Sequence, residues 1–333
     1  MASRGNPHLA WEKTSSINFG VDIACFSNRF FGSVDVYRKR GKDIIGYTSL
    51  SAVLGTSAEL MNNAELSNKG VEVVLGTNLE VVSGIDFSTK ITYSYNKNEI
   101  TGLHHPVYHA GNILGGSFVE GYPTQSIWAI NYLGMEEGIA YVEGPEGMKV
   151  SMDDISMLYS GDGLKFLKYM GPATDPHTMG WSGSFSGYGF NLSFLVTGKF
   201  GGHFQAPFFY SMITSDGKYV ANKFIREVIK GSDRVPGWQP ADRGLNQNWT
   251  SYTRYLNTLV ESSSFVKLKE ISLEYNIPSR LVKKMKLNGL KFYGQVRNLG
   301  CIWTANHYGY DPEWLPGSFK PTTTYALGLT INL

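Results

Sequence analysis

Apolar and polar residues alternate along much of this chain, and this period of two is the pattern of a β-strand with two different faces. In residues 85–96 the odd positions hold Ile, Phe, Thr, Ile, Tyr and Tyr, while the even positions hold Asp, Ser, Lys, Thr, Ser and Asn. Residues 190–200 and 323–333 repeat this separation. These three segments are therefore predicted to be strands.

Weaker alternation predicts further strands elsewhere in the chain. Five of them fall at residues 17–25, 30–38, 71–79, 271–277 and 290–298, and three less clear ones at 127–133, 164–170 and 181–185. The pattern as a whole predicts about ten or eleven strands.

Strand length bears on the solvent that the apolar face meets. The clear strands span about 9–12 residues, whereas a strand of a soluble protein has about 5–6 and a tilted membrane strand needs about 9–11. The polar face carries mostly small uncharged residues, as expected for a water-filled lumen. We therefore predict an all-β fold, an antiparallel transmembrane β-barrel.

The predicted connections alternate between short and long. Short ones fall at residues 26–29, 80–84 and 186–189, with a modest one at 278–287, and long ones at 41–69, 97–120, 201–264 and 299–322. Short periplasmic turns and long outer loops are typical of outer-membrane barrels. Segments 127–133 and 181–185 would then both descend, so an ascending strand is needed between them, and residues 164–170 are the candidate.

The segment 6–45 shows how a hairpin would sit in such a wall, with residues 26–29 as its periplasmic turn. One face is predicted to contact lipid through Ile17, Phe19, Val21, Ile23, Phe30, Val34 and Val36. The other face is predicted to line the lumen through Asn18, Asp22, Ser33 and Asp35.

Composition agrees with this prediction. Charged residues make up 17% of the 333 residues, with 42% hydrophobic, 14% aromatic and 38 glycines, and a lipid-facing surface carries few charges. The net charge of +2 gives no reason to expect a nucleic-acid partner. No stretch approaches 18 consecutive apolar residues, so a membrane-spanning helix is excluded. Cys25 and Cys301 are predicted to lie at opposite ends of the wall, unbonded.

Several ordered motifs resemble a known family. They are "NPHLAWEKTSSINFGVDIACFSNRFFGSVDVYRKRGKDII", "ELMNNAELSNKGVEVVL", "EGYPTQSIWAINYLGM", "SSSFVKLKEISLEYNIPSRL", "LKFYGQVRNLGCIWTANHYGYDPE" and "TTYALGLTINL". Together they resemble the C-terminal part of SusC/RagA-type TonB-dependent outer-membrane transporters of Bacteroidetes. "RKRGKD" departs from that family's pattern, and so does the final Leu333, where barrels often end in Phe.

The resemblance implies a location and a set of partners. Residues 1–333 would form the C-terminal half of a roughly 22-stranded barrel, integral to the cell outer membrane, with the plug domain and the N-terminal strands absent from this sequence. The remaining half of the barrel, on the same gene or on a separate chain, would close the sheet. A SusD-like surface lipoprotein, TonB acting through the plug, and lipid or lipopolysaccharide would be the other partners.

Few residues suggest catalysis or metal binding. His104, His105 and His109 lie close together in "LHHPVYHAG", and Asp153, Asp154 and Asp162 are weak candidates for a calcium site. Solvated loops are the more common explanation of both clusters. No nucleophile, base or phosphate loop can be singled out, so the sequence predicts neither an enzyme nor a cofactor.

Aromatic residues in the long loops are the better candidates for ligand contact, because flat rings stack on sugars or peptide side chains. The candidates are Trp238, Trp249, Tyr252, Tyr255, Trp303, His307, Tyr308 and Trp314. The alternative for each is packing between loops or a place in the aromatic girdle of the membrane interface. In "GYDPE" (residues 309–313), Pro312 is expected to fix a turn.

Three functions remain open from the sequence. The first is part of a nutrient importer for an oligosaccharide or a peptide. The second is a SusC-like barrel that acts as the structural scaffold of a surface complex. The third is a soluble carbohydrate-binding β-sandwich, which detergent-free solubility of the chain would favour.

Overall fold

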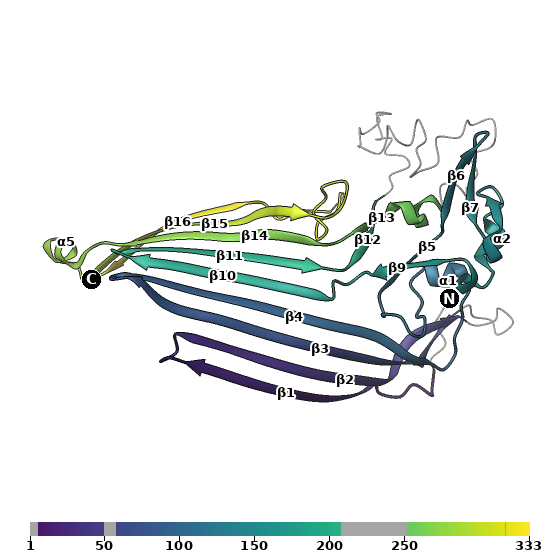
Figure 1. The fold of residues 1–333 in the computed structure, drawn as a ribbon, viewed down its shortest axis with the longest axis horizontal. Helices are drawn as coiled ribbons and strands as arrows, with labels where there is room; N and C mark the ends of the chain where they lie inside the picture. Colours follow the sequence, from purple (N-terminus) through teal and green to yellow (C-terminus); the bar gives the residue numbers. More distant parts are fainter. Residues whose placement is uncertain (1–5, 50–57, 208–251, 317) are drawn as a thin grey trace.

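The longest strands of the protein form one continuous antiparallel sheet, called the wall below (Figure 1). The computed structural model describes residues 6–49, 58–207, 252–316 and 318–333. Within them the wall has nine strands, in the order β1-β2-β3-β4-β10-β11-β14-β15-β16. Their bounds are β1 Lys13–Cys25, β2 Phe30–Ser49, β3 Ala58–Val82, β4 Ile85–Leu103, β10 His177–Gly187, β11 Phe190–Phe200, β14 Phe265–Asn276, β15 Gly289–Thr304 and β16 Thr324–Asn332.

Every wall strand pairs with the preceding wall strand along the chain. Tight turns join β1 to β2, β3 to β4 and β10 to β11 at one end, where helix α5 (Ser279–Lys284) also lies between β14 and β15 (Figure 1). The described parts of the long connections lie at the opposite end. The predicted short connections are confirmed, and long connections follow β4, β11 and β15 as predicted, whereas most of the segment 41–69 is strand; the final strand ends beside the short turns.

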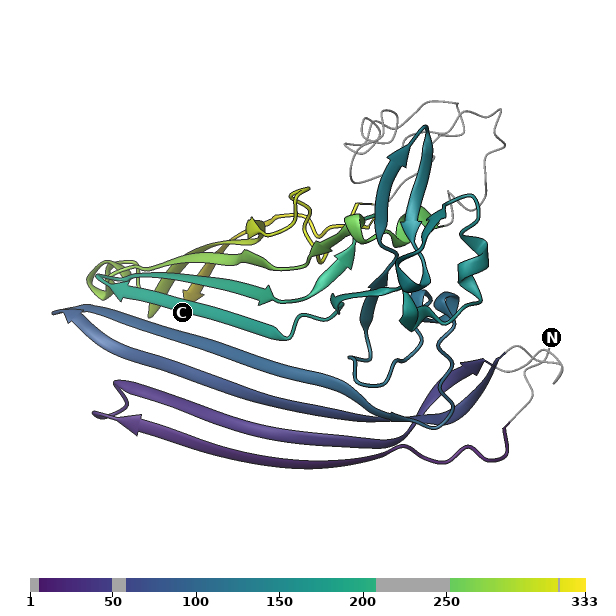
Figure 2. The same ribbon diagram turned by 45° about the vertical axis from the view of Figure 1, so that its right-hand side comes forward.

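The segment 41–69 is not the long loop that the sequence predicted. β2 and β3 span 20 and 25 residues and extend past the other strands (Figure 2). This part of the hairpin lacks a regular alternation of apolar residues, and polar side chains support it. Asn62 donates from Nδ2 to the carbonyls of Ala10 and Asp43, at 2.8 and 2.6 Å.

The register places the apolar residues of neighbouring strands side by side on one face. Phe19 is opposite Val36, Val36 is opposite Val71, and Val71 is opposite Tyr95. This face is exposed, with Ile17 at 76% and Phe19 at 70% of their full accessibility. Val21, Ile23, Phe30, Val34 and Val36 are exposed on the same face, as predicted. Large exposed apolar residues in regular rows indicate a surface that meets lipid and not water.

The opposite face of the wall is polar and carries aromatic rings that lie on glycines. Asn18 donates to the Asp35 carboxylate across β1 and β2 at 3.3 Å. Tyr37 lies directly opposite Gly70, and a Cβ added to this glycine would collide with the Tyr37 ring. Phe31 and Gly76 make the same contact. Glycines at these positions let large inner side chains lie flat against the sheet.

Residues 104–176 fold into a separate layer at the long-connection end, and residues 203–207 and 252–263 pack against it. We call these three segments the extension. Their elements are α1 (Ala110–Leu114), β5 (Ser126–Ala129), β6 (Tyr132–Glu136), β7 (Ile139–Glu143), β8 (Lys149–Ser151), α2 (Ser156–Tyr159), β9 (Lys168–Pro172), β12 (His203–Gln205) and β13 (Val260–Ser262). Figure 2 shows them gathered beyond the ends of β4 and β10.

The extension has its own hydrophobic core. Buried members include Ile113, Val142, Met152, Ile155, Leu256 and Leu259. The predicted strands at 127–133 and 164–170 belong here: residues 126–129 and 168–172 pair as a small two-stranded sheet, β5 with β9. The prediction that these segments span the wall is therefore wrong, and the wall of the described residues has nine strands where about ten or eleven strands were predicted. β4 pairs directly with β10, which removes the need for an extra ascending strand.

The two cysteines lie at opposite ends of the wall and are not bonded to each other. Cys25 ends β1 beside the first short turn, and Cys301 pairs with Lys267 toward the long-connection end. In the described residues we find no helix with the length and apolar character needed to cross a membrane.

Candidate functional site

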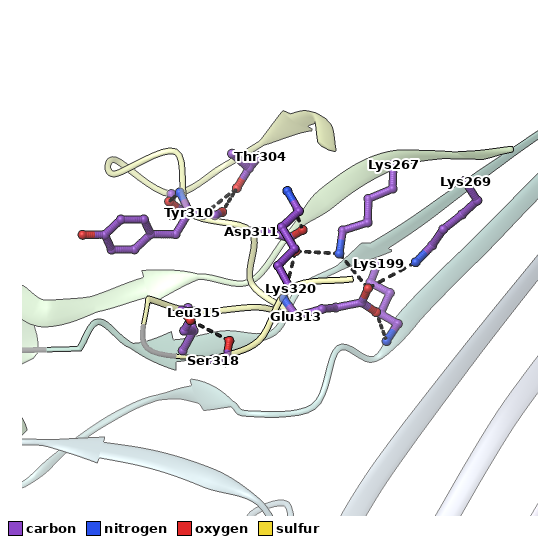
Figure 3. Close-up of polar contacts among 11 residues, drawn as sticks. Lys199, Lys267, Lys269, Thr304, Tyr310, Asp311, Glu313, Leu315, Ser318 and Lys320 are labelled. Atoms are coloured by element: carbon purple, nitrogen blue, oxygen red, sulfur yellow. Dashed lines mark hydrogen bonds and ion pairs between the residues drawn. The ribbon is translucent and has the colours of Figure 1, made fainter. Parts of the chain in front are cut away.

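The last long connection, residues 305–323, is fixed to the inner face of the wall by a buried lysine. Lys267 of β14 extends from the wall, and its side chain is only 4% exposed. Its Nζ lies 2.5 Å from Asp311 Oδ1 and 2.7 Å from Glu313 Oε2 (Figure 3). A buried ammonium group needs such partners, because a lone charge in a desolvated site costs several kcal/mol.

Glu313 is the centre of this cluster, which we call the loop anchor: Lys199, Lys267, Lys269, Asp311 and Glu313. Its carboxylate also forms ion pairs with Lys199, whose Nζ lies 2.9 Å from Oε1, and with Lys269, whose Nζ lies 3.4 Å from Oε2. Burial by itself raises the pKa of the Glu313 carboxyl, but the hydrogen bonds from Lys267 and Lys199 outweigh burial and lower the pKa to about 2. Three strand lysines thus hold one loop carboxylate.

A second polar cluster shapes the start of the same loop. Asn306 donates from Nδ2 to Thr304 Oγ1 at 2.5 Å and to the Tyr310 carbonyl at 2.8 Å, and its Oδ1 accepts from the Tyr310 amide at 2.8 Å. The Asp311 side chain accepts from the Glu313 amide at 3.1 Å. The expected turn at Pro312 is therefore present, since the Trp314 amide donates to the Asp311 carbonyl.

The structure separates the four aromatic and imidazole candidates near this loop. Trp303 stands on the outward face of β15, 48% exposed, with its ring centroid 6.3 Å from that of Phe200. Tyr308 is buried in the core and stacks on Tyr310. His307 is exposed beside the buried carboxylate of Glu261, and Trp314 is 38% exposed. Their contact with a ligand stays a prediction.

Tyr252 and Tyr255 pack against the core of the extension. Tyr252 meets the ring of Tyr159 edge-on, with 5.4 Å between the centroids, and Arg254 lies over the Tyr255 ring. Trp238 and Trp249 lie outside the described residues. The extension therefore uses Tyr252 and Tyr255 at least partly for packing.

A polar pocket of about 580 Å³ lies where β4 and β10 part, between the wall and the extension. Three asparagines of the inner face line it. Asn96 and Asn98 each donate from Nδ2 to Asn68 Oδ1, at 3.3 and 3.0 Å. Asn98 in turn accepts from the amide and the hydroxyl of Thr124, at 2.7 and 2.9 Å. These bonds make a pre-formed site, which we call the seam pocket.

Aromatic rings from the extension complete the seam pocket. Tyr122 and Tyr169 line it, with their ring centroids 4.7 Å apart, and the Trp128 ring packs against both of them. The sequence reasoning missed these residues. The motif "EGYPTQSIWAI" (residues 120–130) carries Tyr122 and could have pointed to the pocket, whereas Tyr169 is brought there by the β5–β9 pairing.

The proposed metal ligands do not converge. Asp162 caps the short turn that follows it by accepting from the Leu164 amide at 3.1 Å, and Asp153 and Asp154 are exposed. Across residues 6–49, 58–207, 252–316 and 318–333, no group of three His, Cys, Asp or Glu side chains is placed to hold a metal ion. His104, His105 and His109 form no such group.

One antiparallel sheet with an apolar outer face, a polar inner face, tight turns at one end and folded connections at the other is a wall of an outer-membrane β-barrel. The chain belongs to the TonB dependent receptor-like, beta-barrel family, which matches residues 1–299. It is accordingly an outer-membrane protein. A soluble sandwich does not fit, because all nine long strands of the described residues lie in one sheet.

Relatives and solved structures agree with this assignment. The chain is 25% identical to TonB-dependent receptor P3 of Formosa agariphila over 92% of its length, and 23% identical to TonB-dependent receptor SusC of Bacteroides thetaiotaomicron over 98%. A structure of the RagAB peptide importer in the closed-closed state covers the whole chain at a TM-score of 0.76 and 22% identity, which shows a shared fold.

The chain covers only part of each of these proteins. It spans 31% of P3 and 32% of SusC, and 37% of the aligned RagAB chain. The chain thus corresponds to about a third of the length of each of these proteins.

Proposed function

We propose that this chain is the C-terminal part of the barrel of an outer-membrane importer that takes up an oligomeric nutrient, an oligosaccharide or a peptide. The family supports this proposal, because its relatives are TonB-dependent receptors and one matched structure is a peptide importer. TonB would supply energy through a plug domain in another part of the protein.

The seam pocket is the observation that carries the proposal. It combines amide groups of Asn68, Asn96 and Asn98 with the rings of Tyr122 and Tyr169. Amides can exchange hydrogen bonds with hydroxyl or peptide groups, and tyrosine rings offer flat contact surfaces. A few convergent polar groups beside aromatic rings in a pre-formed hollow are typical of ligand sites.

The edges of the wall indicate the partner that would close it. Within the described residues β1 pairs only with β2, and β16 only with β15. Unpaired backbone N–H and C=O groups are not tolerated in hydrocarbon. The remaining strands of the barrel, on the same or a separate chain, would pair with both edges, and a SusD-like surface lipoprotein would cover the long-connection end.

Uptake by cells that carry the whole protein tests the proposal. Tyr169→Ala removes one ring of the seam pocket, and Tyr188→Ala removes an exposed ring at the opposite end of the wall as a matched control. We expect uptake of a labelled oligosaccharide or peptide to fall in the first variant only. A wild-type protein that imports neither class, although it is assembled and TonB is present, would favour the scaffold function.

A further inference from the structure

A row of cations crosses three wall strands just above the apolar band of the outer face. Arg38 of β2 is directly opposite Lys69 of β3, and Lys69 is directly opposite Lys97 of β4. All three side chains are exposed. The neighbouring row toward the short turns is Phe19, Val36, Val71 and Tyr95. Two residues of strand span about 7 Å, so on β2, β3 and β4 the cations begin where the apolar surface ends, while Ile17 of β1 lies directly opposite Arg38.

The row is short of anions. Lys97 pairs with Glu99 at 2.7 Å. The same Glu99 carboxylate also attracts Lys69, whereas Arg38 and Arg40 have no ion-pair partner among the residues that the structure describes. Like charges directly opposite each other on neighbouring strands are destabilising. The arrangement therefore gains stability if an external anion binds across it.

A recess of about 250 Å³ lies beside the row. Arg38, Arg40 and Lys42 line it, together with one carboxylate, Glu65. Ser67 lines it as well and is only 4% exposed. Its hydroxyl has no hydrogen-bond partner in the described part of the chain. A buried hydroxyl without a partner is costly, and a ligand oxygen in this recess could receive its hydrogen bond.

We propose that Arg38, Arg40 and Ser67 bind a phosphate group on the headgroup of an anionic lipid in the outer leaflet of the outer membrane. Arginine holds phosphate through two parallel N–H donors, and the neighbouring lysines add positive charge. The acyl chains of such a lipid would lie on the apolar rows of β1 to β4. The proposal rests on the outer-membrane location of the chain and not on import.

Position favours a lipid over a soluble anion. The recess opens on the outward face, and the residues one row below it are exposed and apolar: Phe19 at 70% and Val36 at 49%. A lipid contacts both the cations and these side chains, whereas a free phosphate contacts the cations alone. An amphipathic ligand therefore matches the whole surface.

The experiment uses the purified whole protein that contains this chain, delipidated in a non-ionic detergent. Binding of phosphorylated lipid A and of dephosphorylated lipid A is measured by native mass spectrometry. Arg38→Gln with Arg40→Gln removes the charges, while Lys39→Gln is the matched control, because Lys39 lies between them on the other face, over the Tyr37 ring. Ser67→Ala tests the hydroxyl.

We expect the double variant to weaken binding of phosphorylated lipid A by roughly tenfold or more, since charge-assisted hydrogen bonds are the strong ones. Lys39→Gln should bind like the wild type, and Ser67→Ala should lose less than the double variant. Equal binding of the two lipids, or wild-type binding by the double variant, would overturn the proposal. Inorganic phosphate that displaces the lipid completely would point to a soluble anion and would also overturn it.

Folding can be separated from binding. Heat-modifiable mobility on a gel reports whether the barrel is assembled. If the double variant fails to assemble, the single variants Arg38→Gln and Arg40→Gln are compared with Lys39→Gln in its place. If both single variants assemble and both bind phosphorylated lipid A as well as the wild type does, the proposed phosphate site is contradicted.

Discussion

The wall and the extension place their hydrophobic residues in opposite ways. In the wall, Ile91 and Leu327 are 42% and 90% exposed. In the extension, Val142 and Leu256 are fully buried. Few of the buried hydrophobic residues come from wall strands; Ile100 and Phe265 are examples. The two regions of the chain thus place their apolar side chains in different surroundings: the extension buries them away from water, and the wall exposes them to lipid.

This difference explains what the sequence could predict. Period two identified all nine wall strands, because a wall face must stay apolar along its whole length. The same signal misassigned 127–133 and 164–170, since short strands in the extension also alternate. Residues 41–69 lacked the period because asparagine side chains such as Asn62 support that part of β2 and β3.

The candidate site was less predictable than the fold. "GYDPE" was expected to form a turn, but the contact of its Glu313 with Lys199 and Lys267 joins residues 114 and 46 positions apart. The seam pocket joins Asn68 to Thr124 through Asn98, and such pairings depend on the fold and not on local pattern. Aromatic content alone selected rings such as Tyr308 that the structure buries.

The largest effect is expected at the loop anchor, which fixes residues 305–323 to the wall. Lys267→Met leaves Asp311 and Glu313 without their buried cation, and removing one partner of a buried ion pair costs about 3–5 kcal/mol. Hydrogen exchange of residues 306–316 should rise sharply. Lys269→Met, which removes an exposed partner at 3.4 Å, should cost about 0–1 kcal/mol. Equal exchange in both variants would show that the anchor does not hold the loop.

A truncation in the hydrophobic core tests whether buried apolar side chains stabilise the extension. Leu256→Ala should destabilise the extension by about 2–5 kcal/mol, the usual cost of emptying a buried leucine site. Limited proteolysis should then cut residues 104–176 while the wall remains assembled. Leu164→Ala, at a 41% exposed position, should change little. Loss of the wall together with the extension would contradict their independence.

A charge introduced on the outward face tests whether that face of the wall contacts lipid. Ile91→Lys should cost about 2–4 kcal/mol, as expected for a lysine near the bilayer midplane. Its neighbour Thr92 points to the inner face, so Thr92→Lys should be tolerated. Denaturant unfolding in lipid vesicles measures both. A larger loss for Thr92→Lys would reverse the assignment of the two faces.

A smaller effect is expected from pH. The pKa of Glu313 in the folded protein is about 2, below the ordinary value of 4.5. The ionised carboxylate therefore stabilises the loop above pH 4.5, and this contribution is lost as the pH falls from 4.5 toward 2. Hydrogen exchange in residues 306–316 should rise over that range. Glu313→Gln should remove most of this pH dependence, and a wild-type loop unchanged at pH 2 would contradict it.

The central claim is that alternate residues of the wall face lipid and water. Spin labels placed singly at residues 87–96 of the whole protein, with Cys25 and Cys301 replaced by serine, measure it directly in vesicles. Odd positions should be accessible to oxygen dissolved in the bilayer, and even positions to a water-soluble nickel complex. Accessibility without a period of two, or with the faces reversed, would contradict the account.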